Sequence, residues 1–424
     1  MYVFEDFQNP RLPEIPDYTV NVLDFGAVAD DKTLNTGAFA RAIEDCACRG
    51  GGQVVVPAGK WLTGAIHMKS NIELHLEEGC CLQFTGEKSA YLPVVYTSFE
   101  GIRCYNYSPL IYGYQLHDVA VTGKGVIDGN GAEWWEWKQN DTGVNDIYIA
   151  CMNDTPVETR VYGEERFGLR PCLLQMAECE NVLLEGITLK NSPFWTVHPV
   201  WCKDVTIRRL TLDNPFDSPN TDSINVESCD TVLVEECNIL GGGDDIYTLK
   251  AGRGPDGWAV GKPCQNVLIR NCRASNVRGG GIVIGSEMSG GVKNIFVQDC
   301  MFENIMNGIK IKSKKGRGGY VKNIHYQNIK AENVRYGIHF GVRYAWDDQF
   351  SGNDLTAMPE IGDIFVTNYY CKKAEHAIVL EGEDGCMLKN IHLNNVTMHD
   401  VEEALAAEYV ESLSVENICL KKSE

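Results

Sequence analysis

The sequence has no apolar run that approaches the length of a membrane span. Its first residues, Met1 to Asp6, have neither the basic start nor the apolar stretch of a secretion signal. From these two absences we expect a cytoplasmic protein that does not bind membranes. Positive charge is also scarce, because 38 Lys and Arg stand against 58 Asp and Glu and the net charge is −20. This balance argues against a protein that binds nucleic acids or anionic membranes.

The cysteines and histidines do not have the spacing of a zinc site. There are 17 cysteines, an odd number, and without an export signal we expect them to be free thiols. Many recur three residues before or five residues after the first apolar residue of a predicted strand. Thiols at one phase of a repeat stack in a column, where cysteine packs as a small buried hydrophobe. We therefore assign them to the core.

A short strand pattern recurs along most of the chain. Its apolar anchors lie 23, 27, 35, 28 and 29 residues apart, at Val182, Val205, Val232, Val267, Ile295 and Ile324. A period in the twenties, with β-branched strands and Asn or Gly corners, is typical of a solenoid. The 3.6-residue apolar period of two-helix repeats is absent. We predict an all-β protein, a single right-handed parallel β-helix.

The N-terminal part of the chain has a different pattern, with a predicted helix from about Asn35 to Cys48, a stop at Gly50–Gly52 and a strand at 53–57. We expect residues 1–65 to form a cap with the first strands and residues 66–424 to form the β-helix as one structural unit. Such a cap covers the open end of the stack, because exposed strand edges invite aggregation.

Three aspartates fall on consecutive turns of the repeat: Asp222 in Asn220-Thr221-Asp222, and Asp244 and Asp245 after Gly243. Adjacent rungs of a β-helix are about 4.8 Å apart, so we expect these carboxylates to meet. Each motif alone is a common turn, but their placement on adjacent rungs is hard to explain by turn chemistry. Carboxylates with divided acid and base roles are what cleavage of a glycosidic bond requires.

Other polar residues share this wall of the predicted helix. His198, Lys250 and Lys312 lie 16, 18 and 17 residues after their strand anchors, a position equivalent to that of Asp222. Lys310 and Lys312 alternate with isoleucines, which predicts a strand with both lysines on one face. Such a face suits a substrate that contains carboxylates.

Two aromatic clusters fall on predicted loops, Trp134 with Trp135 and Trp137, and Arg343 with Tyr344 and Trp346. Their rings either stack on sugars or cover the core. A loop that closes one end of the groove produces an enzyme that removes terminal sugars.

Together these features resemble glycoside hydrolase family 28, the polygalacturonases and rhamnogalacturonan hydrolases, and in particular its bacterial exo-polygalacturonase-like branch. The resemblance extends over nearly the whole chain and is carried by Asn191–Pro199, Asn220–Asp222, Gly243–Asp245, Ile284–Gly291 and Ile309–Ser313. It implies a β-helix that hydrolyses with inversion and needs no metal or organic cofactor. It also implies that Asp244 is the general acid and that Asp222 and Asp245 hold and deprotonate the water. The candidate substrate contacts are Asn220, His198, Lys250, Lys310, Lys312 and Glu287.

The chain departs from the family pattern at three places. The Gly-His-Gly signature reads Arg278-Gly279-Gly280-Gly281, so its histidine is missing. Arg-Ile-Lys reads Lys310-Ile311-Lys312, which keeps the charge but loses the bidentate fork of arginine. The usual Cys-Ile-Ala-Ile is Ile246–Leu249. The acid and base residues are thus intact while part of the substrate contact differs.

We therefore predict an exo-acting hydrolase that releases terminal galacturonate from pectin-derived oligosaccharides, with a uronate-containing substrate as its partner. A rhamnosidase or rhamnogalacturonan-type hydrolase is the alternative with the same chemistry. A β-helix polysaccharide lyase would use calcium and an arginine base, but no arginine accompanies the aspartate motifs at a matching phase. The last alternative, a sugar-binding solenoid without activity, does not explain the retained aspartates. The oligomeric state stays open.

Overall fold

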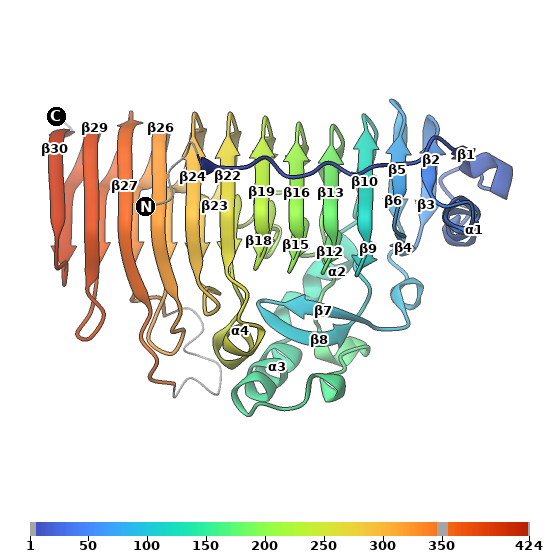
Figure 1. Ribbon diagram of the computed structural model, residues 1–424, viewed down its shortest axis with the longest axis horizontal. Coiled ribbons are helices and arrows are strands. Elements are labelled where there is room, and N and C mark those ends of the chain that lie inside the picture. The colour runs from blue at the N-terminus through green and yellow to red at the C-terminus, as the bar shows by residue number, and fades with distance from the viewer. Residues whose placement is uncertain (1–5, 346–354, 423–424) are drawn as a thin grey trace.

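The computed structural model describes residues 6–345 and 355–422 and shows a right-handed parallel β-helix. Figure 1 shows its rungs side by side along the long axis, with the N-terminal helix at one end and the last strands at the other. The fold prediction is confirmed. The predicted anchors are register partners: Val182 pairs with Val205, Val205 with Val232, and the series continues through Val267, Ile295 and Ile324.

Three ladders of parallel strands form the walls, and the long strands near the C-terminus take part in more than one of them. The first ladder contains β1 (Thr19–Asn21), β2 (Gly52–Val56), β5 (Ile72–Leu76), β10 (His117–Gly123), β13 (Glu180–Glu185), β16 (Lys203–Arg208), β19 (Asp230–Glu235), β22 (Cys264–Arg270) and β24 (Val292–Gln298). The second contains β3 (Gly59–Thr63), β6 (Cys80–Phe84), β11 (Val126–Asp128), β14 (Thr188–Lys190), β17 (Thr211–Asp213) and β20 (Asn238–Gly241). The third contains β4 (Ile66–His67), β9 (Ile111–Tyr114), β12 (Leu174–Ala177), β15 (Val197–Val200), β18 (Ile224–Glu227) and β21 (Tyr247–Lys250). The strands that extend them are β23 (Arg273–Gly285), β25 (Met301–Lys312), β26 (Tyr320–Gly341), β27 (Glu360–Cys371), β28 (Ala374–Glu381), β29 (Leu388–Glu408) and β30 (Leu413–Lys422).

The helices lie outside the ladders. Helix α1 (Thr36–Cys48) covers the N-terminal end of the stack, as Figure 1 shows. An antiparallel hairpin of β7 (Val95–Phe99) and β8 (Ile102–Asn106) lies on one side of the β-helix with α2 (Ala132–Trp135), α3 (Thr142–Met152) and α4 (Gly254–Val260). Short 3₁₀ turns occupy Val22–Phe25, Lys88–Tyr91, Glu136–Gln139, Val157–Thr159 and Glu165–Phe167. None of the helices in residues 6–345 and 355–422 combines the length and the apolar character that a membrane crossing needs.

The N-terminal region contains the first strands of the stack as well as the covering helix. Strand β2 already pairs with β5, so the rungs begin before residue 66. Residues 6–18 do not cover the end of the stack but run along its outside, where Phe7 packs on Leu233, Leu268 and Phe296. These outward side chains come from three successive rungs, and an extended segment buries them.

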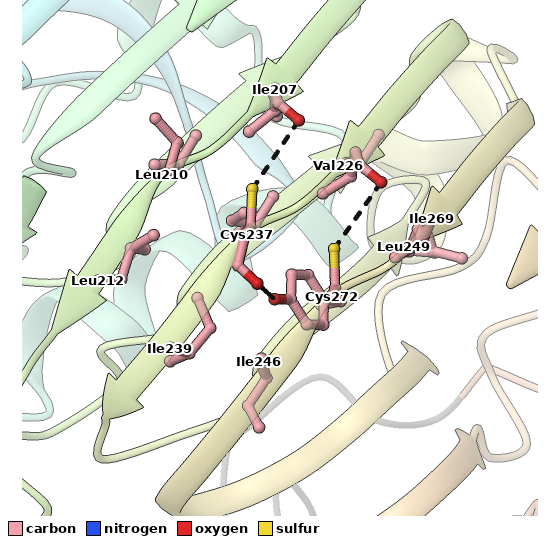
Figure 2. Close-up of a cluster of buried hydrophobic side chains, with 14 of the residues drawn as sticks. Ile207, Leu210, Leu212, Val226, Cys237, Ile239, Ile246, Leu249, Ile269 and Cys272 are labelled. Carbon is pink, nitrogen blue, oxygen red and sulfur yellow. Dashed lines mark hydrogen bonds between the residues drawn. The ribbon is translucent and has the colours of Figure 1, made fainter. Parts of the chain in front are cut away.

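The core consists of side chains that alternate inward along each strand, with free thiols among them. All 17 cysteines are unpaired and all but Cys48, Cys81 and Cys419 are buried. Figure 2 shows Cys237 and Cys272 among aliphatic side chains from several rungs. Burial raises the pKa of the Cys264 thiol to about 12, which keeps it protonated and apolar. The cysteines therefore pack the core, as the column pattern predicts.

Asparagines stack at one corner of successive rungs. Asn294 Nδ2 donates to Asn266 Oδ1 at 3.0 Å, and Asn294 Oδ1 accepts from Asn323 Nδ2 at 2.9 Å. All three have the left-handed backbone conformation, with φ of 55°, 56° and 57°. Asparagine tolerates this conformation better than other residues with a Cβ, so one residue type satisfies both the turn and the ladder.

Replacing Asn294 with alanine removes both side-chain hydrogen bonds at a corner that disfavours a plain Cβ. We expect the free energy of unfolding to fall by about 2 kcal/mol, measured by urea denaturation. Asn294→Gly loses the same bonds but fits the left-handed conformation. The glycine variant should therefore be more stable than the alanine variant, and the opposite order would contradict this account of the corner.

Candidate active site

The three aspartates lie at one end of the third ladder, on neighbouring turns. Asp222 precedes β18, Asp244 and Asp245 precede β21, and the Ser223 N–H donates to the Asp245 carbonyl at 2.9 Å. Each carboxylate offers one oxygen, and these three oxygens lie within 4.8 Å of one another. The structure thus brings together the residues that rung counting placed on adjacent turns.

The backbone around the trio is closely packed. A Cβ on Gly243 would lie 1.7 Å from the Ser218 carbonyl oxygen, so only glycine fits there. The Gly243 N–H donates to Thr221 Oγ1 at 3.1 Å, which ties the second turn to the first. The close fit at Gly243 and its hydrogen bond to the Thr221 hydroxyl therefore hold the two turns in one register.

The three carboxylates have different proton affinities. Burial raises the pKa of Asp222 well above its ordinary value, and Asp244 adds to that shift. Burial, followed by repulsion from Asp245, also raises the pKa of Asp244. Burial alone would raise the pKa of Asp245 too, but Lys312 and Lys310 outweigh it and hold this pKa below its ordinary value. The trio therefore keeps a proton on the Asp222–Asp244 pair while Asp245 is ionised.

Lysines from neighbouring rungs supply the compensating charge. Lys312 Nζ lies 2.7 Å from Asp245 Oδ2, and the Gly280 N–H donates to Asp245 Oδ1 at 2.9 Å. Lys250 Nζ lies 3.7 Å from Asp222 Oδ2 and 2.9 Å from Glu287 Oε2. Burial alone would lower the pKa of Lys250, but Glu287 and Asp222 outweigh it and raise it. Both lysines are therefore charged partners of carboxylates.

These residues line a cavity of about 430 Å³, within the usual size range of ligand sites. Five of its lining residues are carboxylates and six are cations: Glu100, Asp222, Asp244, Asp245 and Glu287 against Lys138, Lys250, Arg253, Arg278, Lys310 and Lys312. Trp195, Pro219, Asn220, Gly243, Gly279, Met306, Asn307 and Tyr344 complete the lining.

Most of the predicted substrate contacts line this cavity, namely Asn220, Lys250, Glu287, Lys310 and Lys312. Asn220 Oδ1 accepts a hydrogen bond from Arg170 Nη2 at 2.7 Å, which orients its amide. Both oxygens of Glu287 are occupied, one by Lys250 and the other by Arg253 Nη2 at 2.6 Å. Glu287 thus holds two cations in place within the cavity wall.

His198 does not line the cavity, so the structure does not support the prediction that it contacts the substrate. Its side chain is fully buried, with Nε2 2.8 Å from Glu227 Oε2 and Nδ1 2.9 Å from Gln175 Nε2. Its ring meets the edge of Trp195 at 4.9 Å between centroids. The predicted offset was wrong by three residues, because Val197 pairs with Ile224 and the position beside Asp222 is therefore Trp195. The imidazole of His198 lies instead in a buried polar cluster with Gln175 and Glu227. This cluster includes Ser98, which donates to Glu227 Oε2 at 3.1 Å.

The loop aromatics also do not stack in the cavity. Trp134 and Trp137 are buried and pack on each other at 5.0 Å, so they cover the core. Trp135 Nε1 donates to the Ser192 carbonyl. Tyr344 does line the cavity, and Lys312 Nζ lies 5.2 Å from its ring centroid. Trp346 lies outside the described residues.

Sequence reasoning missed several lining residues because they lie outside the repeat. Glu100 lies at the tip of the β7–β8 hairpin, where Glu100 and Gly101 both have positive φ, as a two-residue turn requires. The Arg253 side chain donates to the Glu100 carbonyl at 3.0 Å and also pairs with Glu287. The hairpin therefore closes one side of the cavity through an arginine between two segments that are 153 residues apart.

Within the described residues 6–345 and 355–422, the aspartate trio is also the group whose carboxylate oxygens lie close enough together to share a metal ion. Two of its three carboxylates are already paired with Lys312 and Lys250. A divalent cation there would meet two nearby positive charges, so the donor set does not fit a resident metal.

Comparison with known proteins agrees with the glycosidase chemistry that this carboxylate site suggests. The sequence model described as Glycosyl hydrolases family 28 matches residues 163–419. A probable polygalacturonase of Vitis vinifera is 32% identical over 393 residues, which cover 90% of this chain and 74% of that protein. The chain belongs to glycosyl hydrolases family 28.

Solved structures agree with this assignment. The exopolygalacturonase of Thermotoga maritima is 36% identical, with a TM-score of 0.91 over 97% of this chain and 94% of that one. A polygalacturonase of Erwinia carotovora, at 21% identity and a TM-score of 0.71, shares the fold. The protein is therefore a glycoside hydrolase, and its cavity contains carboxylates suited to acid and base roles in family 28 chemistry.

Lys312→Met tests how Asp245 is kept ionised. Without the ammonium at 2.7 Å, the pKa of Asp245 should rise, so the carboxylate takes up a proton at higher pH than in the wild type. We expect activity to fall by about 100-fold at neutral pH and its acidic limb to move to higher pH, measured as kcat/KM against pH. Lys315→Met, on an exposed lysine outside this cavity, is the matched control. An unshifted acidic limb would contradict the role of Lys312.

Asp244→Asn tests the protonated partner. Because the pKa of Asp244 is raised in the folded protein, its ionised form destabilises the fold once the pH exceeds that pKa. The amide should reduce turnover by about 10²–10⁴-fold and unfold at an equal or higher temperature than the wild type at pH 8. In the wild type, activity should decline as the pH rises through the raised pKa. Undiminished turnover would refute the assignment of Asp244 as the acid.

Proposed function

We propose that this family 28 hydrolase removes terminal galacturonate from pectin-derived oligosaccharides. The observation that carries this proposal is the charge of the cavity, where six cations outnumber five carboxylates although the chain has a net charge of −20. Lys310 lines the cavity and makes no hydrogen bond or ion pair with a described residue. An unpaired ammonium beside a catalytic trio attracts an anionic sugar such as a uronate.

The chemistry assigned to the trio follows from its proton affinities. Asp244, which shares a proton with Asp222 and has the acid role in the family resemblance, protonates the departing glycosidic oxygen. Asp222 and Asp245 hold the attacking water, and Asp245, which Lys312 keeps ionised, accepts its proton. The proton that leaves Asp244 is thus replaced by the proton of the water, and no other reactant is needed.

Release of single sugars is supported by the closed side of the cavity. The tip of the β7–β8 hairpin, Arg253 and the buried Tyr148 form one continuous contact beside the site, because Tyr148 donates to Glu100 and lies under the Arg253 guanidinium at 4.3 Å. A chain that enters from the open side therefore meets a wall beyond its terminal sugar. The name of the Thermotoga maritima relative, an exopolygalacturonase, supports the same mode.

We also propose that the enzyme works in the cytoplasm on imported oligosaccharides. The support is its content of 17 free thiols, which is typical of a reducing compartment. Gly280 and Lys310, which replace the histidine and arginine of the family pattern, favour a rhamnogalacturonan-type substrate as the second candidate.

The decisive experiment identifies the first product and its anomer. The protein is incubated with oligogalacturonides, rhamnogalacturonan oligosaccharides and rhamnosyl oligosaccharides, and early products are resolved by NMR. We expect monogalacturonate from the first time point, with inverted configuration. The nearest oxygens of the trio lie within 4.8 Å, closer than the roughly 6.5–9.5 Å usual for inverting pairs, so the anomer is an independent test.

The Asp244→Asn protein is the negative control for this experiment. Early products of mixed length would contradict the exo mode, and a product that retains its configuration would contradict inversion. Release of rhamnose alone would favour the second candidate.

A further inference from the structure

Two polar side chains on one wall of the cavity have no partner among the described residues. Asn307, on β25, is 1% exposed, and its Oδ1 makes no hydrogen bond. Arg278, on β23, is exposed at the same cavity and makes no side-chain hydrogen bond or ion pair. A buried polar atom that has no protein partner and lines a cavity is placed to bind a polar group there.

The chain keeps the space beside these groups free of side chains. Gly280 is the register partner of Asn307 on the neighbouring rung. A Cβ on Gly280 would lie 3.4 Å from the Asn307 Cβ and 3.5 Å from Asp245 Oδ1. A Cβ on Gly279 would lie 2.3 Å from the backbone of Asp244 and Asp245. The two glycines thus leave Asn307 close to Asp245, and Val283 Cγ2 is the nearer side-chain atom, at 2.7 Å from the position of a Gly280 Cβ.

The other cations of the cavity are already engaged. Lys250 pairs with Glu287, Lys312 with Asp245, and Arg253 with Glu287 and Glu100. Lys310 and Arg278, which make no hydrogen bond or ion pair through their side chains with a described residue, differ in depth, since Lys310 is half-buried and Arg278 is exposed. Two such cations at different depths match two successive uronates, and the guanidinium fork suits a carboxylate.

We propose that Arg278 and Asn307 form the subsite for the second sugar, the one that departs when the terminal galacturonate is released. The Arg278 guanidinium binds the carboxylate of this sugar at the rim, and the Asn307 amide hydrogen-bonds one of its hydroxyls beside Asp245. The proposal rests on the proposed function and extends it, because it assigns recognition of the second uronate to an arginine outside the lysine strand.

The test compares digalacturonate with the same disaccharide carrying a methyl ester on its reducing-end sugar. In the wild type we expect a KM about tenfold lower for the free acid, from the charge-assisted contact. In Arg278→Gln this ratio should fall to about one. Arg278→Lys keeps the charge without the fork and should give an intermediate ratio.

Arg273→Gln is the matched control, because Arg273 is an exposed arginine on the same strand that does not line the cavity. It should keep the wild-type ratio. Asn307→Ala should raise the KM of both substrates about fivefold without changing their ratio, since a hydroxyl contact does not sense the ester.

The outcomes separate this proposal from the function on which it rests. A wild-type enzyme that cleaves neither disaccharide refutes the proposed function and this subsite with it. A wild-type enzyme that cleaves both, with a ratio that Arg278→Gln leaves unchanged, overturns the subsite while the function stands. A ratio that Arg273→Gln also abolishes overturns it too, because the effect would then belong to surface charge in general.

Discussion

The in-register pairing of parallel strands is the constraint on which this molecule depends. Each rung places its residues directly beside those of the next, so Val182, Val205 and Val232 stack in the core. The same pairing brings Asp222 beside Asp245, although 23 residues of sequence separate them. A slip by one residue would turn the core side chains outward and separate the carboxylates. Stability and catalysis thus rest on the same hydrogen bonds.

Burying several carboxylates at one point costs free energy. Lysines from neighbouring rungs offset part of this cost. Lys250 comes from the rung of Asp245, and Lys312 comes from β25, two ladder positions further along. These lysines keep Asp245 ionised while the Asp222–Asp244 pair holds a proton. The division of roles within the trio therefore comes from the positions of the cations, since the three side chains are chemically identical.

The repeat explains which parts could be predicted from the sequence. Strand anchors and the cysteine column follow from offsets that the rungs share, and the aspartates meet because their motifs lie on consecutive rungs. The offset of His198 failed because turn lengths differ between rungs, and the register of Val197 with Ile224 places Trp195 beside Asp222. Gln175 and Glu227 hold the imidazole in a buried polar cluster. Glu100 and Arg253 lie on insertions between rungs, where no period relates them to the site, and only the folded hairpin joins them.

Residues with a charged partner and residues without one have different parts in catalysis and in substrate specificity. Lys250 and Lys312 are tied to Glu287 and Asp245, so neither can change without disturbing the proton balance of the trio. Arg278 and Asn307, whose side chains have no partner among the described residues, line the same cavity as the trio but hold none of its carboxylates. A substitution there alters which sugar fits at little cost to the acid and base. Chemistry therefore stays with the paired residues, while substrate preference is free to change at the unpaired ones.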